Sequence, residues 1–120
     1  MTEIINELYL MCQDNDFSMS RAMELVCGMD VNQPFDDPKY KGNLTTFLSA
    51  ACLHTNLRMA KLLLENGADP NYILYADRPG WQENPFWDLQ YCVYSEDFYK
   101  ITGNLLLSVI FLFNFSILYL

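Results

Sequence analysis

Apolar residues recur at helical spacing in two stretches of the chain, and a glycine follows each stretch. The residues at positions i, i+3 and i+4 are Ala22, Leu25 and Val26 in the first stretch and Ala60, Leu63 and Leu64 in the second. This spacing places the three side chains on one face of a helix. Gly28 and Gly67 can end these helices, because glycine adopts a positive φ without a Cβ clash. The pattern predicts two amphipathic helices that end at positive-φ glycines.

The two glycines also begin an internal repeat. Residues 28–32 read Gly-Met-Asp-Val-Asn and residues 67–71 read Gly-Ala-Asp-Pro-Asn, so glycine, aspartate and asparagine recur at the same three offsets. Short Asp and Asn side chains hydrogen-bond to nearby backbone amides in turns. We therefore interpret them as turn-forming residues and expect a fold built from repeated units.

A partner helix is predicted before the second amphipathic helix. Residues 45–51 combine threonine hydroxyls that can cap a helix with small alanines. Residues 54–56 interrupt this pattern, and the next helix is expected over residues 57–66. The adjacent leucines at 62–64 cover more than one helix face, which is typical of a helix that neighbouring units sandwich.

The first unit is more degenerate and is expected to cover residues 2–32. Ser18 or Ser20 is expected to cap its second helix. Its first helix is expected to bury four apolar residues, namely Ile4, Leu8, Met11 and Cys12. The outer face then carries acidic side chains, as suits a terminal unit of a repeat stack.

Residues 57–71, Leu-Arg-Met-Ala-Lys-Leu-Leu-Leu-Glu-Asn-Gly-Ala-Asp-Pro-Asn, resemble the second helix and turn of an ankyrin repeat. Residues 45–51 resemble the start of the first helix in that family, Thr-Pro-Leu-His-x-Ala-Ala, with Thr46 in place of proline and Leu48 in place of histidine. The resemblance implies an all-α fold, a short ankyrin-type solenoid of stacked helix-turn-helix repeats with protruding turns. It also implies a protein–protein interaction module.

The resemblance divides the chain into an ankyrin-repeat domain over residues 1–100 and an apolar C-terminal tail over residues 101–120. Two repeats are expected over about residues 2–32 and 42–71, and an incomplete third repeat over residues 84–100.

The tail, residues 101–120, contains no charged residue. Three interpretations remain open: a capping helix on the last repeat, a membrane anchor, or an unrelated sequence left after truncation or a change of reading frame. A helix of this length spans about 30 Å, the hydrocarbon thickness of a bilayer, although Gly103, Asn104 and Asn114 weaken such a span. The alternative function is therefore a membrane-tethered ankyrin scaffold.

Charge narrows the set of partners. Fifteen acidic and seven basic residues give a formal net charge of −8, and the bases are scattered along the chain. Without a basic stripe we expect no nucleic-acid ligand, and a charged partner protein is expected to be basic. The first ten residues lack a secretory signal pattern, and the four cysteines show no close pairing. Reduced thiols in a cytoplasmic protein are expected.

No pattern in the sequence indicates catalysis. Cys52 and His54 are two residues apart, and residues at that spacing do not face each other on a helix. The acidic pairs Asp36–Asp37 and Glu96–Asp97 are typical of solvated turns, and no glycine-rich phosphate loop is present. We therefore expect no enzyme activity, no cofactor and no metal.

With catalysis not expected, the chain is expected to act through a binding surface. The resemblance implies a concave face built from the protruding turns and the first helix of each repeat. The candidate partner-binding residues on it are Asp36, Asp37, Tyr40, Tyr72, Tyr75, Trp81 and Trp87. Tyr and Trp are the residue types that dominate interface hot spots. Packing of Tyr75 and Trp81 against a long turn, and of Trp87 in the core, remain open alternatives.

Overall fold

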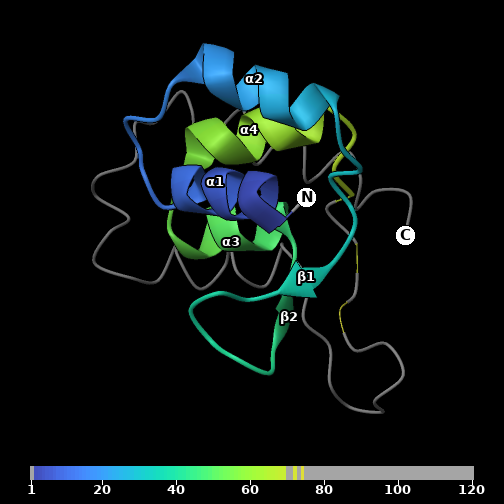
Figure 1. Cartoon of the computed structure of the whole chain (residues 1–120). Helices are drawn as coiled ribbons and strands as arrows, with labels where there is room; N and C mark the ends of the chain where they lie inside the picture. The colour runs from blue at the N-terminus through green and yellow to red at the C-terminus, as the bar shows by residue number, and fades with distance from the viewer. Residues whose placement is uncertain (1, 70–71, 73, 75–120) are drawn as a thin grey trace, which may run out of the picture.

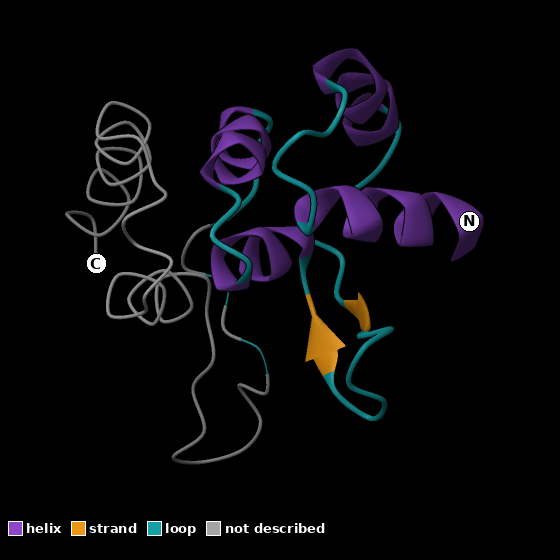
Figure 2. Ribbon diagram, turned by 90° about the vertical axis from the view of Figure 1, so that its left-hand side faces the viewer, coloured by secondary structure: helices purple, strands orange, loops and turns teal. Residues whose placement is uncertain are grey.

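The computed structural model describes residues 2–69, 72 and 74, and in these residues the protein is mostly helical (Figure 1). The elements, in chain order, are α1 (Thr2–Cys12), α2 (Met19–Cys27), β1 (Phe35–Asp36), β2 (Leu44–Thr45), α3 (Phe47–Leu53) and α4 (Leu57–Glu65). Figures 1 and 2 show α1 beside α3 in one layer and α2 beside α4 in a second layer. The described part of the chain therefore forms two helical hairpins side by side, joined by a short β-hairpin.

The β-hairpin corrects the expectation of an all-α fold. β1 and β2 pair antiparallel, with Phe35 opposite Thr45 and Asp36 opposite Leu44. Phe35 and Thr45 are buried while their strand neighbours are exposed, which is the alternation of a strand with one covered face. Gly42, at φ +89°, lets the chain reverse between the two strands. This protruding turn is thus extended and paired, whereas the resemblance implied only a turn.

Polar side chains cap the N-termini of three helices, α2, α3 and α4. Hydroxyl and amide side chains are favoured at this position because they accept hydrogen bonds from free backbone amides. Ser18 accepts a hydrogen bond from the amide of Arg21, and Thr46 accepts one from the amide of Ser49. Asn56 does the same for α4. These residues satisfy amides that have no partner within the helix. Of the two predicted caps, Ser18 and Ser20, the structure has Ser18. The helix start at 45–51 and the interruption at 54–56 are confirmed.

The two repeated glycines differ in conformation. Gly67 adopts φ +95°, as expected for a helix stop. Gly28 adopts φ −100°, so the prediction of a positive φ there is wrong. The amides of Gly28 and Met29 bond to the carbonyls of Leu25 and Val26, so the last turn of α2 tightens gradually and needs no left-handed residue.

The core lies between the two layers. Its members include the predicted Ala22, Leu25, Val26, Ala60 and Leu63, while Leu64 is partly buried. On α1 the buried face is rotated from the expected one, because Ile4 is 40% exposed and Tyr9 is 4% exposed. Leu8 and Cys12 are fully buried as expected. Tyr9 is drawn inward because its ring packs edge-on against Phe35, with centroids 6.0 Å apart.

Two asparagines connect the hairpins. Asn56 is 1% exposed and its amide group donates to the carbonyls of Met11, Cys12 and Asp14 at the end of α1. Asn32 donates to the carbonyl of Gly67 over 3.0 Å and accepts from the amide of Asp69 over 2.7 Å. The first Gly-x-Asp-x-Asn turn therefore lies beside residues 67–69, the described start of the second.

The expected third repeat, residues 84–100, and the tail, residues 101–120, lie outside the described residues. Among the residues that are described, no helix is both long and apolar enough to span a membrane.

Candidate functional site

The finger, defined as residues 35–45, protrudes from the layer that contains α1 and α3 (Figure 2). Its tip is organised by the Asp37 carboxylate, whose Oδ1 accepts hydrogen bonds from the amides of Lys39 and Tyr40. The amide of Asp37 donates to the carbonyl of Asn43 over 2.8 Å and extends the strand pairing. The tip is therefore a hydrogen-bonded turn with a defined conformation.

A latch holds the finger against α1. The hydroxyl of Tyr9 donates to Oδ1 of Asp37 over 2.8 Å. The Tyr9 ring contacts Phe35, and the Phe35 ring lies 4.6 Å from that of Phe47 at the start of α3. Burial raises the pKa of the Tyr9 hydroxyl above its ordinary value of 10.0, and the neighbouring Asp37 carboxylate raises it further. Tyr9 therefore stays protonated as a donor at neutral pH, and the latch fixes the position of the finger.

The finger groove, a cavity of about 380 Å³, lies between α1 and the tip of the finger. It is lined by Asn6, Tyr9, Leu10, Gln13, Pro38 and Lys39. Leu10 is 63% exposed and Tyr40, beside the groove, is 49% exposed. The ammonium of Lys39 lies 5.6 Å from the centroid of the Tyr40 ring. Exposed apolar and aromatic groups next to hydrogen-bonding side chains suit contact with another molecule.

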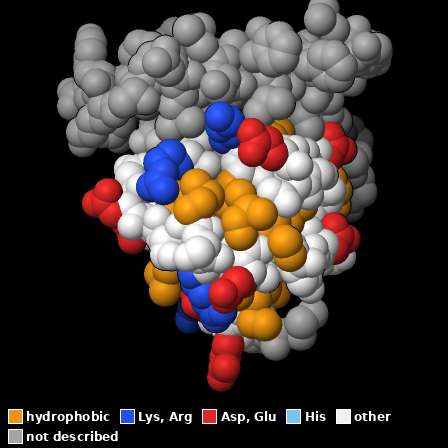
Figure 3. All heavy atoms as spheres, turned by 90° about the horizontal axis from the view of Figure 1, so that it is seen from above, with side chains coloured by type: hydrophobic (Ala, Val, Ile, Leu, Met, Phe, Trp, Pro, Cys, Tyr) orange, Lys and Arg blue, Asp and Glu red, His pale blue; other side chains and the backbone are white. Residues whose placement is uncertain are grey.

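The opposite surface, over α2 and α4, has a different character. Figure 3 looks onto it and shows apolar side chains interspersed with acidic and basic ones. Arg21 binds Glu7 through two hydrogen bonds, 2.8 and 2.9 Å long, and also contacts Glu24 at 2.9 Å. These partly exposed charges are paired within the chain, and the apolar side chains of this surface include Met19 and Met23, 40% and 37% exposed.

The predicted site residues that the structure describes differ in location and in exposure to solvent. Asp36 is exposed on β1, Tyr40 is exposed at the tip of the finger, and Tyr72 is partly buried after the second turn. Asp37 is half-buried and its Oδ1 already holds three donors within the chain. The structure thus brings Asp37 and Tyr40 together in one turn. Tyr75, Trp81 and Trp87 lie outside the described residues.

Sequence reasoning predicted none of the six residues that line the finger groove, among them Tyr9 and Leu10. Ile5, Leu8 and Cys12 already complete a helical face at i, i+3 and i+7, so Leu10 is an apolar residue on the polar side of α1. The sequence therefore contained one indication of this site: Leu10 is apolar but does not fit the spacing of the buried face of α1. The contact of Tyr9 with the finger depends on how the finger folds, which the local sequence does not determine.

Two of the three cysteines in the described part of the chain are buried, and the third, Cys27, is exposed. Cys12 and Cys52 are both fully buried, and burial raises the pKa of the Cys12 thiol to about 12. His54 ends α3 and is partly buried, which lowers the pKa of its imidazole below 6.5, and the nearby Lys39 lowers it further. Among residues 2–69, 72 and 74, no group of three His, Cys, Asp or Glu side chains could hold a metal ion.

Comparison of the sequence with protein-family models and with curated proteins, and of the structure with solved structures, gives no significant match.

Proposed function

We propose that this chain is an ankyrin-type repeat protein that binds another protein through its concave face, which is formed by α1, α3 and the finger. Support for the repeat assignment comes from the Gly-x-Asp-x-Asn turns, which are joined by the hydrogen bonds of Asn32 to Gly67 and Asp69. Helical hairpins that contact their neighbours in series are the basis of repeat solenoids.

The observation that carries the binding proposal is the finger groove with its exposed Leu10, together with the exposed Tyr40 beside it. A large apolar side chain that is mostly exposed contributes little to folding, and its burial by a partner is favourable by about 1.5 to 3 kcal/mol. The latch between Tyr9 and Asp37 holds the finger before a partner arrives. Such preorganisation lowers the entropic cost of binding.

Charge supports a basic partner. The chain carries a net charge of −8, and Asp36 is an exposed carboxylate on the finger. Complementary charge increases the association rate and excludes partners of like charge. Recognition, rather than catalysis, is proposed because the cysteine thiols of α1 and α3 are buried away from any substrate.

Reconstituted binding tests the proposal. The full chain is used to isolate a partner, the partner is purified, and the dissociation constant is measured for the wild type and for Leu10→Ala and Tyr40→Ala. Each substitution is expected to weaken binding by about tenfold. Met19→Ala is the matched control, because Met19 is 40% exposed on α2 in the other layer. Loss of affinity in Met19→Ala with unchanged binding by both groove variants would contradict the proposal.

A further inference from the structure

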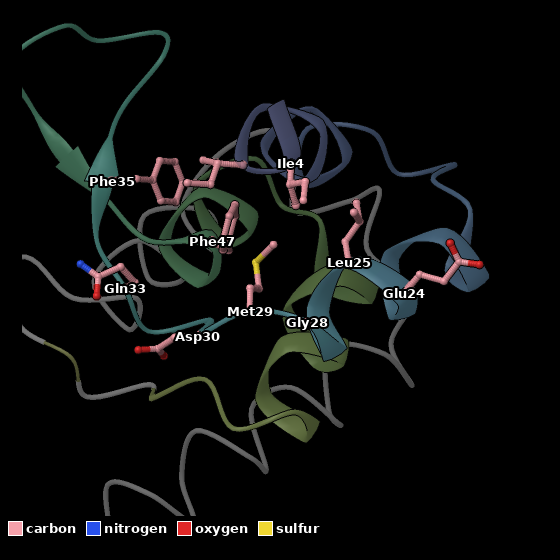
Figure 4. Close-up of a pocket in the computed structure, with 10 residues that line it drawn as sticks. Ile4, Glu24, Leu25, Gly28, Met29, Asp30, Gln33, Phe35 and Phe47 are labelled. Carbon is pink, nitrogen blue, oxygen red and sulfur yellow. The ribbon is translucent and has the colours of Figure 1, made fainter. Parts of the chain in front are cut away.

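A second hollow, the α1–α2 pocket, lies at the other side of the finger base and has a volume of about 510 Å³. Its apolar lining consists of Ile4, Ile5, Leu25, Met29, Phe35 and Phe47. Figure 4 shows these side chains around a common space, with the carboxylates of Glu24 and Asp30 at its margins. The volume lies within the range of ligand pockets and accommodates one large apolar side chain.

Strand β1 borders this pocket, and among the described residues no strand pairs with the edge of β1 that faces away from β2. Gln33 and Phe35, which precede and begin β1, both line the pocket. The amide of Asp37 donates across to Asn43 on the side of β2. Because backbone groups alternate in direction along an antiparallel strand, the N–H and C=O of Asp36 point away from β2. Such an outward pair of groups can bind a further extended strand.

The charges around the pocket are acidic. Among its lining residues Glu24 and Asp30 are charged, and none is basic. Glu24 is already paired with Arg21 at 2.9 Å, whereas Asp30 and the exposed Asp36 form no ion pair with another described residue. A partner is therefore expected to bring a positive charge.

We propose that the α1–α2 pocket and the edge of β1 form a second docking site, which binds an extended segment of another protein. In this segment a leucine-sized or phenylalanine-sized side chain enters the pocket, on the same side as Phe35. The residues before and after this apolar residue in the segment are Lys or Arg. Because side chains alternate along a strand, they point to the opposite side, where Asp36 lies. The site is separate from the finger groove and does not depend on the function proposed for that groove.

Titration of the isotope-labelled full chain with the peptide Thr-Lys-Leu-Lys-Thr, acetylated and amidated at its ends, tests the proposal by NMR. The expected result is a saturable change in the methyl resonances of Ile4 and Met29 and in the amide resonance of Asp36. Thr-Glu-Leu-Glu-Thr and Thr-Lys-Ser-Lys-Thr are expected to bind at least about tenfold more weakly, because each lacks one of the two interactions.

Variants separate the parts of the site. Ile4→Lys places a charge at the pocket and is expected to weaken binding about tenfold, whereas Met19→Lys, at a residue of the same 40% exposure on α2, leaves binding unchanged. Asp36→Asn keeps the backbone donor and removes the charge. Asp36→Pro also removes the donor and is expected to bind about tenfold more weakly than Asp36→Asn.

Three outcomes would overturn the proposal. One is equal affinity for the Lys and Glu peptides. A second is an equal loss of affinity in Ile4→Lys and Met19→Lys. The third is a set of nuclear Overhauser contacts from Ile4 and Met29 to residues 75–120 or to a second copy of the chain, since the pocket would then already be filled.

Discussion

At the scale of single residues, Asn56 links the two hairpins. Its side chain makes four hydrogen bonds, three from its amide group to the end of α1 and one from the amide of Met59 to its Oδ1. One residue thus terminates α1 and begins α4. A buried polar group is favourable only while its partners remain in place, so this position tolerates few substitutions.

Asn56→Ala is expected to lower the free energy of unfolding by about 2 to 4 kcal/mol, because it removes a helix cap and leaves buried carbonyls without donors. Asn56→Asp keeps the cap but directs a carboxylate at three carbonyls, and it is expected to destabilise at least as much. Urea unfolding followed by circular dichroism measures both. Asn6→Ala, at an exposed position of α1, is the control and should change stability little. A near-neutral Asn56→Ala would refute this account of the residue.

Thiol reactivity differs among the cysteines of the described residues. Cys27 is exposed, whereas Cys12 and Cys52 are buried. In a Cys92→Ser variant, an aromatic disulfide reagent should modify Cys27 quickly, and Cys12 and Cys52 only as fast as the protein unfolds. The raised pKa of Cys12, about 12, keeps that thiol protonated and unreactive. Simultaneous modification of all three thiols in the folded protein would contradict the packing of α1 and α3.

At the scale of elements, the ends of the helices distinguish two glycines that look equivalent in sequence. Gly67 has φ +95° and Gly28 has φ −100°, and a Cβ at either position would have room. Gly67→Ala is therefore expected to cost about 1 kcal/mol through backbone strain alone. Gly28→Ala is expected to be neutral or slightly stabilising, because alanine restricts the unfolded chain. Thermal unfolding of the two variants measures the difference, and equal effects would contradict the assigned conformations.

The end of α3 introduces a dependence of stability on pH. The pKa of His54 is lowered, first by burial and then by Lys39, so the folded state binds a proton less readily than the unfolded state. The contribution of His54 to stability is therefore complete above about pH 6.5 and is lost as the pH falls through the lower, folded pKa.

Unfolding midpoints in urea, measured from about pH 7.5 down to about pH 5, should decrease for the wild type and change less for His54→Asn. The carboxylate of Glu7, whose pKa is lowered by Arg21, titrates below 4.5 and so does not interfere. If the midpoints of the wild type and of His54→Asn fell equally with pH, His54 would not be the cause of the pH dependence.

The local pattern of the sequence predicted the helices and their caps well, because spacing and capping are local properties. Ser18 and residues 54–56 are examples. The contacts between elements could not be predicted in the same way. Asn32 was expected to form its own turn, yet it bonds to Gly67 and Asp69 in the next unit. Tyr9 could be identified as a site residue only once the finger was placed against α1.

At the scale of the whole molecule, the two hairpins share one core and several polar links. Arg58 on α4 donates to the carbonyl of Asn15 over 2.7 Å and stacks 4.6 Å from the centroid of the Phe17 ring. These contacts join residues more than forty positions apart, as do the three hydrogen bonds that the Asn56 amide group donates. The finger groove depends on this arrangement, because it lies between an element of the first hairpin and the connection to the second.

An isotope-edited nuclear Overhauser spectrum of the side-chain amide protons tests the shared packing most directly. The account predicts cross-peaks from the Asn56 amide protons to residues 11–14 and from the Asn32 amide protons to residues 67 and 68. Absence of both sets, or backbone contacts typical of strands through residues 47–53 and 57–65, would contradict it.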